Sequence, residues 1–490
     1  MFTCTPVEAD PLASSASCAC CRPALRDADR RIRRELSRRG VLAGATGSLA
    51  GLGLSSKVRA ATGSRAAPPI VLTNFRLFDG RSPTLRGGVR LLIEDGLIRH
   101  ATNGDTGAPD GAQLLDCGGR VLMPGLIDAH WHTVFAGLPV TALMTADVGF
   151  IFLAASAQAE RTLMRGFTTV RDLGGPAFPL KQAIDGGMAT GPRIYPSGAM
   201  ITTTGGHGDL RPVSDLPRSP GGPPSDIERK GAASIADSAE EVRLRVREQL
   251  LQGASQIKLV GGGGVSSPRT TLDMLTFSEP ELRAGVEAAA DRNTYVTVHA
   301  YPTAAIRRAV DAGVQCIEHG HLMDEPAAKL LADKGIWLST QPFVGEDDAA
   351  PLTGQSQVNL LQVIAGTNRV YGLAKKHGIK TAFGSDMLFS AEIAERQGLM
   401  LTHLARWYGN AEILKMATSG NAELMAMSGP RDPYPGKLGV VEDGAYADLL
   451  LVDGDPLQDI GLLAQPDKSL VVIMKDGKIV KDSRAGVRPI

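Results

Sequence analysis

The side chains best suited to chemistry in this chain are histidines, one lysine and one aspartate, each at a predicted strand. His130 and His132 stand two residues apart at the end of the first apolar run. Residues with that spacing in a strand point to the same face, so two imidazoles can reach one cation. The pair alone is weak evidence, because His-x-His also arises by chance.

Four further polar residues stand in or at the ends of β-rich runs in the same way. They are Lys258, His299, His319 and Asp386. Any one of them could be a satisfied core residue or a capping aspartate. Polar residues at the carboxyl ends of apolar parallel strands, taken together, indicate a catalytic site in a barrel.

The elements that must position these residues alternate between strand and helix from about residue 125. Helical patterns follow the strands, as in 239–254, where Val242, Val246 and Leu250 repeat every four positions. Eight such units predict an α/β fold, a (β/α)8 barrel over 125–424. The eight β-rich runs are 125–132, 168–173, 193–197, 256–260, 295–300, 315–319, 336–341 and 381–386.

The flanks of the barrel read differently. Residues 61–124 and 425–490 contain short apolar runs with turn signals such as Asp95-Gly96 and Asp476-Gly477, and Asp-Gly favours hairpins. We therefore predict one small β-sandwich built from both flanks.

Residues 1–60 have the order of an export signal. A basic block at 31–39 precedes an apolar run of 15 residues at 40–54 and the small-residue site Val58-Arg59-Ala60. We expect a twin-arginine-like leader and a periplasmic or secreted protein, or a cytoplasmic one if the leader does not function. The apolar run is shorter than the ~20 residues of a membrane span, and we expect no stable span elsewhere.

Composition narrows the function classes. The chain has 490 residues, with 52 basic and 52 acidic side chains and 4% aromatic residues. A neutral chain with few stacking rings is a poor candidate for binding nucleic acid. Four of the six cysteines lie in the first 21 residues, so the rest of the chain cannot carry a disulfide framework.

Several strings resemble a known family. Residues 123–132 resemble the opening signature of the amidohydrolase superfamily, and 447–452 resemble the return of its C-terminal sandwich. The strings 204–208, 298–301 and 312–320 are similar to the metal-dependent prolidase-like and carboxypeptidase-like group. That group includes ochratoxin-hydrolysing amidases and lies near the imidazolonepropionases.

The resemblance implies a binuclear site for two divalent ions, expected to be Zn²⁺. His130, His132 and Asp386 would bind one ion, His299 and His319 the other, and carboxylated Lys258 would bridge both. A protonated amine repels a cation, whereas a carbamate is an anion with two oxygens.

The resemblance also suggests roles in catalysis. Asp386 would take a proton from the attacking water and pass it to the leaving amine. His207 would bind the substrate or its oxyanion, and Tyr301 a substrate carboxylate. The glycines at 261–264 lack a P-loop's Lys-Ser/Thr and suggest a flexible lid. We interpret Cys316 as a core residue and leave His321 unassigned.

The expected function is hydrolysis of amide bonds in dipeptides or N-acyl amino acids with a free C-terminal carboxylate. This class covers Xaa-Pro dipeptidases, carboxypeptidase-like enzymes and hydrolases of ochratoxin-type amides. Two alternatives are a cyclic-amide hydrolase, as in imidazolonepropionase, and a deaminase. A third is an inactive barrel kept for binding. The family resemblance also suggests a homo-oligomer.

Overall fold

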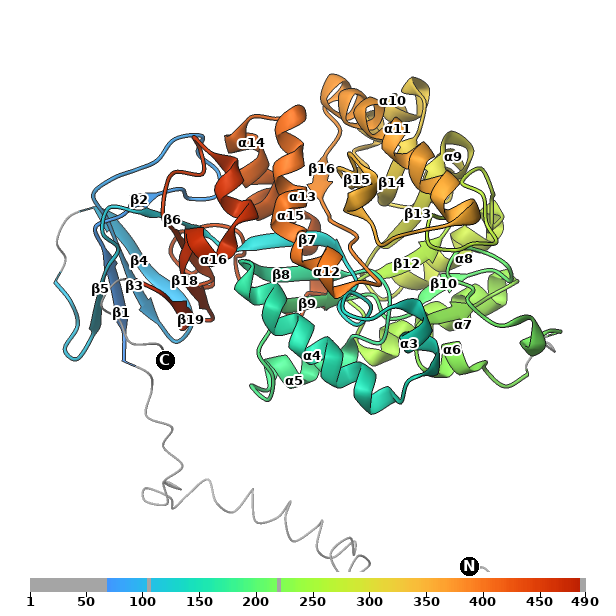
Figure 1. The fold of residues 1–490 in the computed structure, drawn as a ribbon, viewed down its shortest axis with the longest axis horizontal. Coiled ribbons are helices and arrows are strands. Elements are labelled where there is room, and N and C mark those ends of the chain that lie inside the picture. Colours follow the sequence, from blue (N-terminus) through green and yellow to red (C-terminus); the bar gives the residue numbers. More distant parts are fainter. Residues whose placement is uncertain (1–67, 104–106, 218–221, 485–490) are drawn as a thin grey trace, which may run out of the picture. The chain divides into compact units, whose positions relative to one another are not determined.

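The eight predicted barrel strands are all present in the computed structural model, which describes residues 68–103, 107–217 and 222–484. The predicted leader at 1–60 lies outside these residues. Parallel neighbours run in chain order within two groups of strands, which confirms the predicted α/β barrel (Figure 1). The strands are β7 (Leu126–Trp131), β8 (Phe167–Asp172), β9 (Arg193–Pro196), β12 (Ile257–Val260), β13 (Val296–Pro302), β14 (Cys316–Leu322), β15 (Trp337–Thr340) and β16 (Thr381–Phe383).

Single contacts close the ring between these two groups. The amide of Ser255 donates to the carbonyl of Pro196 at 2.8 Å, and the amide of Asp386 donates to that of His130 at 2.8 Å. The Asn421 side chain bridges the junction between β7 and β16, because it donates to the carbonyls of Ile127 at 2.7 Å and Phe383 at 2.8 Å. The first and last barrel strands are thus joined by a side chain from α15 (Asn421–Ala426), which follows both strands in the chain.

Two short strands were not predicted. β10 (Met200–Thr202) and β11 (Ala233–Ile235) follow β9, and β10 pairs in parallel with both β11 and β12. They lengthen the connection between β9 and β12, and His207, Gly208 and Leu210 of this connection lie at the barrel mouth.

The helices follow the strands and begin where the sequence indicates. Val242, Val246 and Leu250 are the buried apolar face of α7, and the amide of Ser278 donates to Glu281 Oε2 at 2.7 Å in a capping box. The helices are α3 (Val140–Thr145), α4 (Val148–Met164), α5 (Phe178–Asp185), α6 (Asp226–Arg229), α7 (Ala239–Gln252), α8 (Glu279–Ala290), α9 (Thr303–Asp311), α10 (Glu325–Lys334), α11 (Gly354–His377), α12 (Ala391–Glu395), α13 (Gln397–His403), α14 (Asn410–Lys415), α15 (Asn421–Ala426) and α16 (Pro466–Ser469). None of those in the described ranges has both the length and the apolar composition of a membrane span.

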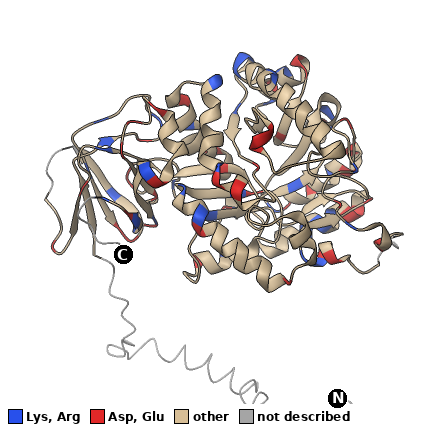
Figure 2. Ribbon diagram, in the orientation of Figure 1, with Lys and Arg blue, Asp and Glu red and all other residues tan. Residues whose placement is uncertain are grey.

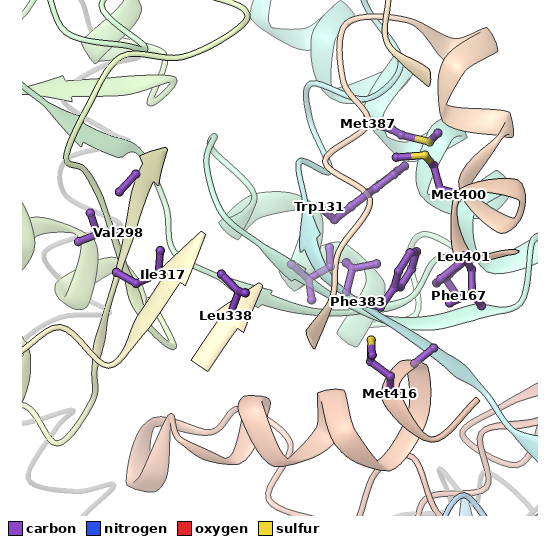
Figure 3. Packing of buried hydrophobic residues seen from close by; sticks show 14 of the residues in the cluster. Trp131, Phe167, Val298, Ile317, Leu338, Phe383, Met387, Met400, Leu401 and Met416 are labelled. Atoms are coloured by element: carbon purple, nitrogen blue, oxygen red, sulfur yellow. The ribbon is translucent and has the colours of Figure 1, made fainter. Parts of the chain in front are cut away.

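The barrel core is one continuous apolar cluster. Trp131, Phe167 and Phe383 come from the strands beside the closing seam, and Met400 and Leu401 from α13 pack against them (Figure 3). Burial of these large side chains, each worth about 1.5–3 kcal/mol, anchors the strand ends that carry the polar residues.

Both flanks contribute to the β-sandwich, at the left of Figure 1. One sheet has the order β4-β3-β1-β5 and the other β19-β18-β17-β6-β2. In the second, Leu449 of β17 pairs antiparallel with Pro124 of β6. Asp95 and Asp476 occupy their hairpin turns with φ of 52°, as Asp-Gly favours. The strands are β1 (Ile70–Thr73), β2 (Arg76–Leu77), β3 (Val89–Glu94), β4 (Leu97–Asn103), β5 (Gln113–Asp116), β6 (Val121–Pro124), β17 (Leu449–Val452), β18 (Leu470–Lys475) and β19 (Lys478–Asp482).

Candidate active site

The six predicted metal ligands come together at the carboxyl ends of the barrel strands. They line a single cavity of about 460 Å³, measured with its open mouth. The six are His130, His132, Lys258, His299, His319 and Asp386. They come from five strands, β7, β12, β13, β14 and β16, or from the residues directly after them.

Asp386 lies between histidines. Its Oδ1 atom is 3.3 Å from Nε2 of His130 and 3.2 Å from Nε2 of His132. One ligand atom from each of His130, His319 and Asp386 lies within 4.8 Å of the others. Burial favours protonation of Asp386, but the neighbouring histidines and Lys258 outweigh it and hold the Asp386 pKa below its usual value. The carboxylate therefore stays ionised.

Three of the four histidines have one ring nitrogen fixed by a carbonyl oxygen. A carbonyl can only accept, so the bonded nitrogen carries the hydrogen and the other keeps its lone pair. Metal-binding histidines are held in this way. The pairs are His132 Nδ1 with the Gly174 carbonyl (3.1 Å), His299 Nε2 with the Gly263 carbonyl (2.8 Å) and His319 Nδ1 with Gln341 Oε1 (2.7 Å). The Nδ1 atom of His130 instead lies 2.8 Å from Glu318 Oε2 in an ion-pair contact and 3.2 Å from Gln341 Nε2.

Burial keeps most of these imidazoles neutral. It lowers the pKa of His130 to about 4 and the pKa values of His299 and His319 well below the usual range. His132 differs because its contact with Asp386 outweighs burial and raises the His132 pKa. Neutral imidazole is the form that binds metals.

Lys258 is only 2% exposed at the floor of the cavity. Burial lowers its pKa to about 8, and the charges of Glu318 and Asp386 only partly oppose the shift. Those two acids make their short contacts with Arg171 and with histidines instead. The amine is therefore closer to its neutral form than an ordinary lysine.

The backbone is unusual at two of the ligands. His319 has a φ of 76° and Asp386 a φ of 51°, a region that side chains other than glycine, asparagine and aspartate seldom adopt. Such conformations cost about 1–3 kcal/mol and concentrate at functional sites. Here the left-handed turns occur where β14 and β16 present their ligands.

A buried ion pair supports the site from below, and the sequence did not single it out. Arg171 Nη2 lies 2.6 Å from Glu318 Oε1, and both side chains are fully buried. The other Glu318 oxygen reaches His130. Burial opposes ionisation of Glu318, but Arg171 and His130 hold its pKa well below the usual value. The charged residues Arg171 and Asp172 inside the β-rich run 168–173 were the available signal.

Asp128 is a second supporting residue that sequence analysis missed. It accepts hydrogen bonds from the amides of His130 at 2.9 Å and Ser385 at 3.1 Å and from Gln397 Nε2 at 2.8 Å. Burial raises its pKa to about 6, with Ser385 and Gln397 opposing. Asp128 thereby ties the chain beside His130 to the chain beside Asp386.

His207 and Tyr301 lie beside the histidine cluster. The His207 ring stacks on His299 with centroids 4.4 Å apart, and the Tyr301 ring stacks on His319 at 4.7 Å. Both line a second cavity of about 560 Å³, measured with its mouth, which also contains Asp386. The structure therefore brings both residues next to the predicted ligands.

The glycines at 261–264 do not form a lid. All four are buried, and the carbonyl of Gly263 accepts from His299. A Cβ atom at Gly264 would overlap the ring of His207, so this position needs glycine for close packing. Sequence analysis predicted a flexible lid from these glycines, whereas in the structure they form a closely packed wall of the site.

The two remaining residues are also buried. Cys316 is fully enclosed in β14, with its sulfur 3.7 Å from Arg171 Nη1. His321 Nε2 lies 2.9 Å from the carbonyl of Gln341. Neither lines the cavity that holds the six ligands.

The chain belongs to the amidohydrolase family, whose model matches residues 121–480. The ochratoxinase of Aspergillus niger is 33% identical over 387 residues, covering 75% of this chain and 77% of the relative.

Solved structures agree with this family. A prolidase solved with N-methylphosphonate-L-proline has a TM-score of 0.78 and 35% identity, covering 84% of this chain and all of that one (100%). A Xaa-Pro dipeptidase with bound methionine has a TM-score of 0.73 and 27% identity, with coverages of 84% and 100%. The expected resemblance to prolidase-like and ochratoxinase-like amidohydrolases is confirmed, and the protein is a hydrolase of this family.

Proposed function

We propose that this protein is a binuclear metal-dependent amidase. Its substrates are dipeptides or N-acyl amino acids with a free C-terminal carboxylate. The observation that carries the proposal is the single buried cavity lined by four histidines, a lysine and an aspartate. The sequence similarity to ochratoxinase and the structural similarity to prolidases favour an amide bond as the target.

The residues fit a pair of divalent ions. The fixed ring nitrogens leave lone pairs for a metal, and nitrogen and oxygen ligands suit zinc. His130, His132 and Asp386 would hold one ion and His299 and His319 the other, with Lys258 as a bridging carbamate. Such ions supply a Lewis acid and an activated water.

Lys258 is suited to carboxylation. Carbon dioxide reacts with a neutral amine, and burial has moved the Lys258 pKa toward neutrality. Formation of the N–C bond releases one proton and leaves an anionic carbamate. An anion at this position also suits a cavity lined by cationic or metal-binding groups.

Asp386 moves the proton. Its pKa lies below the usual value, so the carboxylate is ready to accept a proton from the attacking water. It then delivers that proton to the leaving nitrogen. Its Oδ1 atom lies beside Nε2 of His130 and Nε2 of His132, the nitrogens that would share an ion with it.

His207 is placed to donate to the oxyanion. Its Nδ1 atom lies 2.8 Å from Ser267 Oγ, and that hydroxyl accepts from the Gly208 amide at 3.0 Å. The hydroxyl hydrogen is then free to point at Nδ1, and in this arrangement Nε2 is the protonated nitrogen. Burial lowers the His207 pKa to about 4, so the ring is a neutral donor. Tyr301 would hold the substrate carboxylate in the second cavity.

Metal content and hydrolysis test the proposal together. We expect about two metals per purified chain and cleavage of one or more substrates from a panel of X-Pro, X-Arg, X-Phe and N-aroyl-Phe. Lys258→Ala should lose both metal and activity, whereas Lys329→Ala, whose side chain is 64% exposed on α10, should keep them. One metal per chain that is insensitive to Lys258 would instead indicate a mononuclear deaminase or cyclic-amide hydrolase.

Export through the leader and assembly into a homo-oligomer remain predictions. Comparison of the N-terminus of the protein recovered from cells with Met1 would test the first. The mass in solution would test the second.

A further inference from the structure

A third cavity lies beside the cavity that holds the six predicted ligands, which we call the catalytic cavity. Its walls differ in chemical character from those of the catalytic cavity. It measures about 630 Å³ with its mouth, within the range of small-molecule pockets. Its walls come mainly from α3, α4 and the loop after β10, and they are apolar. Representative wall residues are Leu143, Met144, Ile151, Phe152, Leu210 and Ile227. We call it the apolar cavity.

The apolar cavity adjoins the catalytic cavity. Five residues line both, namely Phe135, Met200, Gly208, Leu210 and Phe389. The second cavity, which contains Tyr301 and His207, adjoins the catalytic cavity through other residues, including His299 and Asp386. The metal-binding cluster therefore lies between the cavity that contains Tyr301 and the apolar cavity.

Phe389 divides these spaces. Among the described residues it alone lines all three cavities. Its φ is 65°, and its amide donates to the carbonyl of Phe135 at 2.8 Å. The two rings stack with centroids 6.1 Å apart. A bulky residue held in a strained conformation by its neighbour is a fixed wall rather than a surface side chain.

The apolar cavity offers no partner for a positive charge. No aspartate or glutamate occurs among the described residues that line it. Its one charged residue, Lys230, has its ammonium bound by the Met144 carbonyl at 2.9 Å and by Asp226 at 3.0 Å. A buried ammonium without a partner is strongly disfavoured.

The adjoining cavities offer none either. The one carboxylate among the described residues lining the catalytic cavity is Asp386, which is committed to the histidines. The second cavity adds only Asp348. Its Oδ2 accepts from the amides of Val344 and Gly345, and its Oδ1 pairs with Arg396. The free α-ammonium of a dipeptide would therefore find no carboxylate on the acyl side.

We infer that the apolar cavity binds the acyl half of the substrate and selects a bulky, uncharged aromatic or branched acyl group. The preferred substrates are then N-acyl amino acids rather than dipeptides. This inference rests on the proposed amidase function and narrows its substrate class. The amino-acid half, with its carboxylate, occupies the cavity that contains Tyr301.

Three matched substrates test the inference on the metal-loaded enzyme. They are N-(2-naphthoyl)-L-phenylalanine, N-acetyl-L-phenylalanine and L-alanyl-L-phenylalanine, which share one leaving group. We expect kcat/KM for the naphthoyl amide to exceed that for the acetyl amide at least tenfold, with the dipeptide lowest. Equilibrium binding of free 2-naphthoic acid, measured by fluorescence, gives a second readout.

Variants in the wall locate the effect. Ala232→Phe fills the cavity and should reduce the naphthoyl-to-acetyl ratio at least fivefold and weaken naphthoic acid binding. Met144→Trp serves the same purpose if Ala232→Phe does not fold. Leu143→Glu supplies a carboxylate and should raise the dipeptide-to-acetyl ratio. Leu153, 75% exposed on α4 and outside the cavity, is the control site, and Leu153→Phe and Leu153→Glu should leave both ratios unchanged.

The outcomes separate the two proposals. Cleavage of the acetyl amide with a naphthoyl-to-acetyl ratio near one, or with ratios unmoved by wall variants, overturns the acyl pocket and keeps the amidase. A dipeptide that is the fastest substrate does the same. If none of the three substrates is cleaved, and the X-Pro and X-Arg members of the wider panel are not cleaved either, the amidase function itself is overturned.

Discussion

The β-sandwich and the barrel mouth bury very different side chains. The sandwich core is a cluster of apolar residues such as Leu91, Leu449 and Leu451. The barrel mouth buries histidines, Lys258, Arg171 and ionised acids, although charged groups elsewhere are spread over the ribbon of both parts (Figure 2). Apolar burial stabilises a fold directly, whereas buried charges are tolerated only in paired networks. The mouth is therefore specialised for chemistry at some expense in stability.

Backbone conformation differs in the same way. In the sandwich, the non-glycine residues with positive φ are Asn74, Asp95 and Asp476, residue types that suit turns. Around the site they include Phe389, a bulky residue that seldom adopts that conformation. Strain at the mouth and relaxed turns in the sandwich make opposite predictions for substitutions.

The largest expected effect is at Asp386. Asp386→Gly removes the proton carrier and a ligand, so kcat/KM should fall about 10³-fold or more. Glycine accepts a φ of 51° without strain, but the substitution also removes a carboxylate whose lowered pKa means that the folded state stabilises its charge. Because the two effects oppose each other, the free energy of unfolding of metal-free protein should change by less than about 1 kcal/mol. Denaturant titration with chelator present measures this change, and a loss of several kcal/mol would mean that Asp386 is mainly a structural partner of the histidines.

Next in size is the ion pair beneath the site. Glu318→Ala leaves Arg171 buried without its partner and should cost about 3–5 kcal/mol of stability. Thermal melting of the metal-free protein checks this value. Glu325→Ala is the matched control, since Glu325 pairs with Lys376 and His377 at 51% exposure, and exposed pairs contribute about 0–1 kcal/mol. Equal losses of stability in the two variants would contradict the expected difference between a buried and an exposed ion pair.

The sandwich core gives the reverse pattern. Leu451→Ala, at a 1% exposed site in β17, should cost about 2–5 kcal/mol through lost burial and a cavity. The folded enzyme, assayed at low temperature, should keep kcat and KM within twofold. A large change in kcat would mean that the sandwich acts on the chemistry.

The smallest effect concerns the junction of sandwich and barrel. Asp476 lies beside Arg193 of β9 and has a side chain 40% exposed. Burial opposes its ionisation, but Arg193 and Lys475 outweigh it and lower the Asp476 pKa below 3.8.

A folded-state pKa below the unfolded one stabilises above about pH 4, and the contribution disappears as pH falls through the folded value. Asp476→Asn should therefore cost less than about 1 kcal/mol at pH 7. The difference from wild type should shrink as pH falls below about 4 in urea titrations. A difference that persists at low pH would assign the effect to packing.

Repeating patterns made the barrel and its ligands predictable. Each ligand stands in or next to an apolar run, so the positions of His299 and His319 at strand ends made them candidates, and the family resemblance supplied their expected role as ligands. Arg171, Glu318 and Asp128 act through partners on other strands. Their roles depend on which strands are neighbours, and no local pattern contains that information.

Glycine and short strands misled the sequence analysis for physical reasons. The glycines at 261–264 are required because His207 fills the space of a side chain, which is a tertiary fact. β10 and β11 have three residues each, too few for a period-two pattern to stand out.

The seam between β7 and β16 has a consequence for how the enzyme is made. Asp128 and Ser385, which join across it, are separated by 257 positions, and a Cβ at Gly384 would overlap His130. Asn421, whose side chain bridges β7 and β16, lies still later in the sequence. A ribosome must therefore complete nearly the whole chain before the first and last ligands can meet. Only a nearly complete chain can therefore be active, and shorter fragments carry some of the histidines without the assembled site.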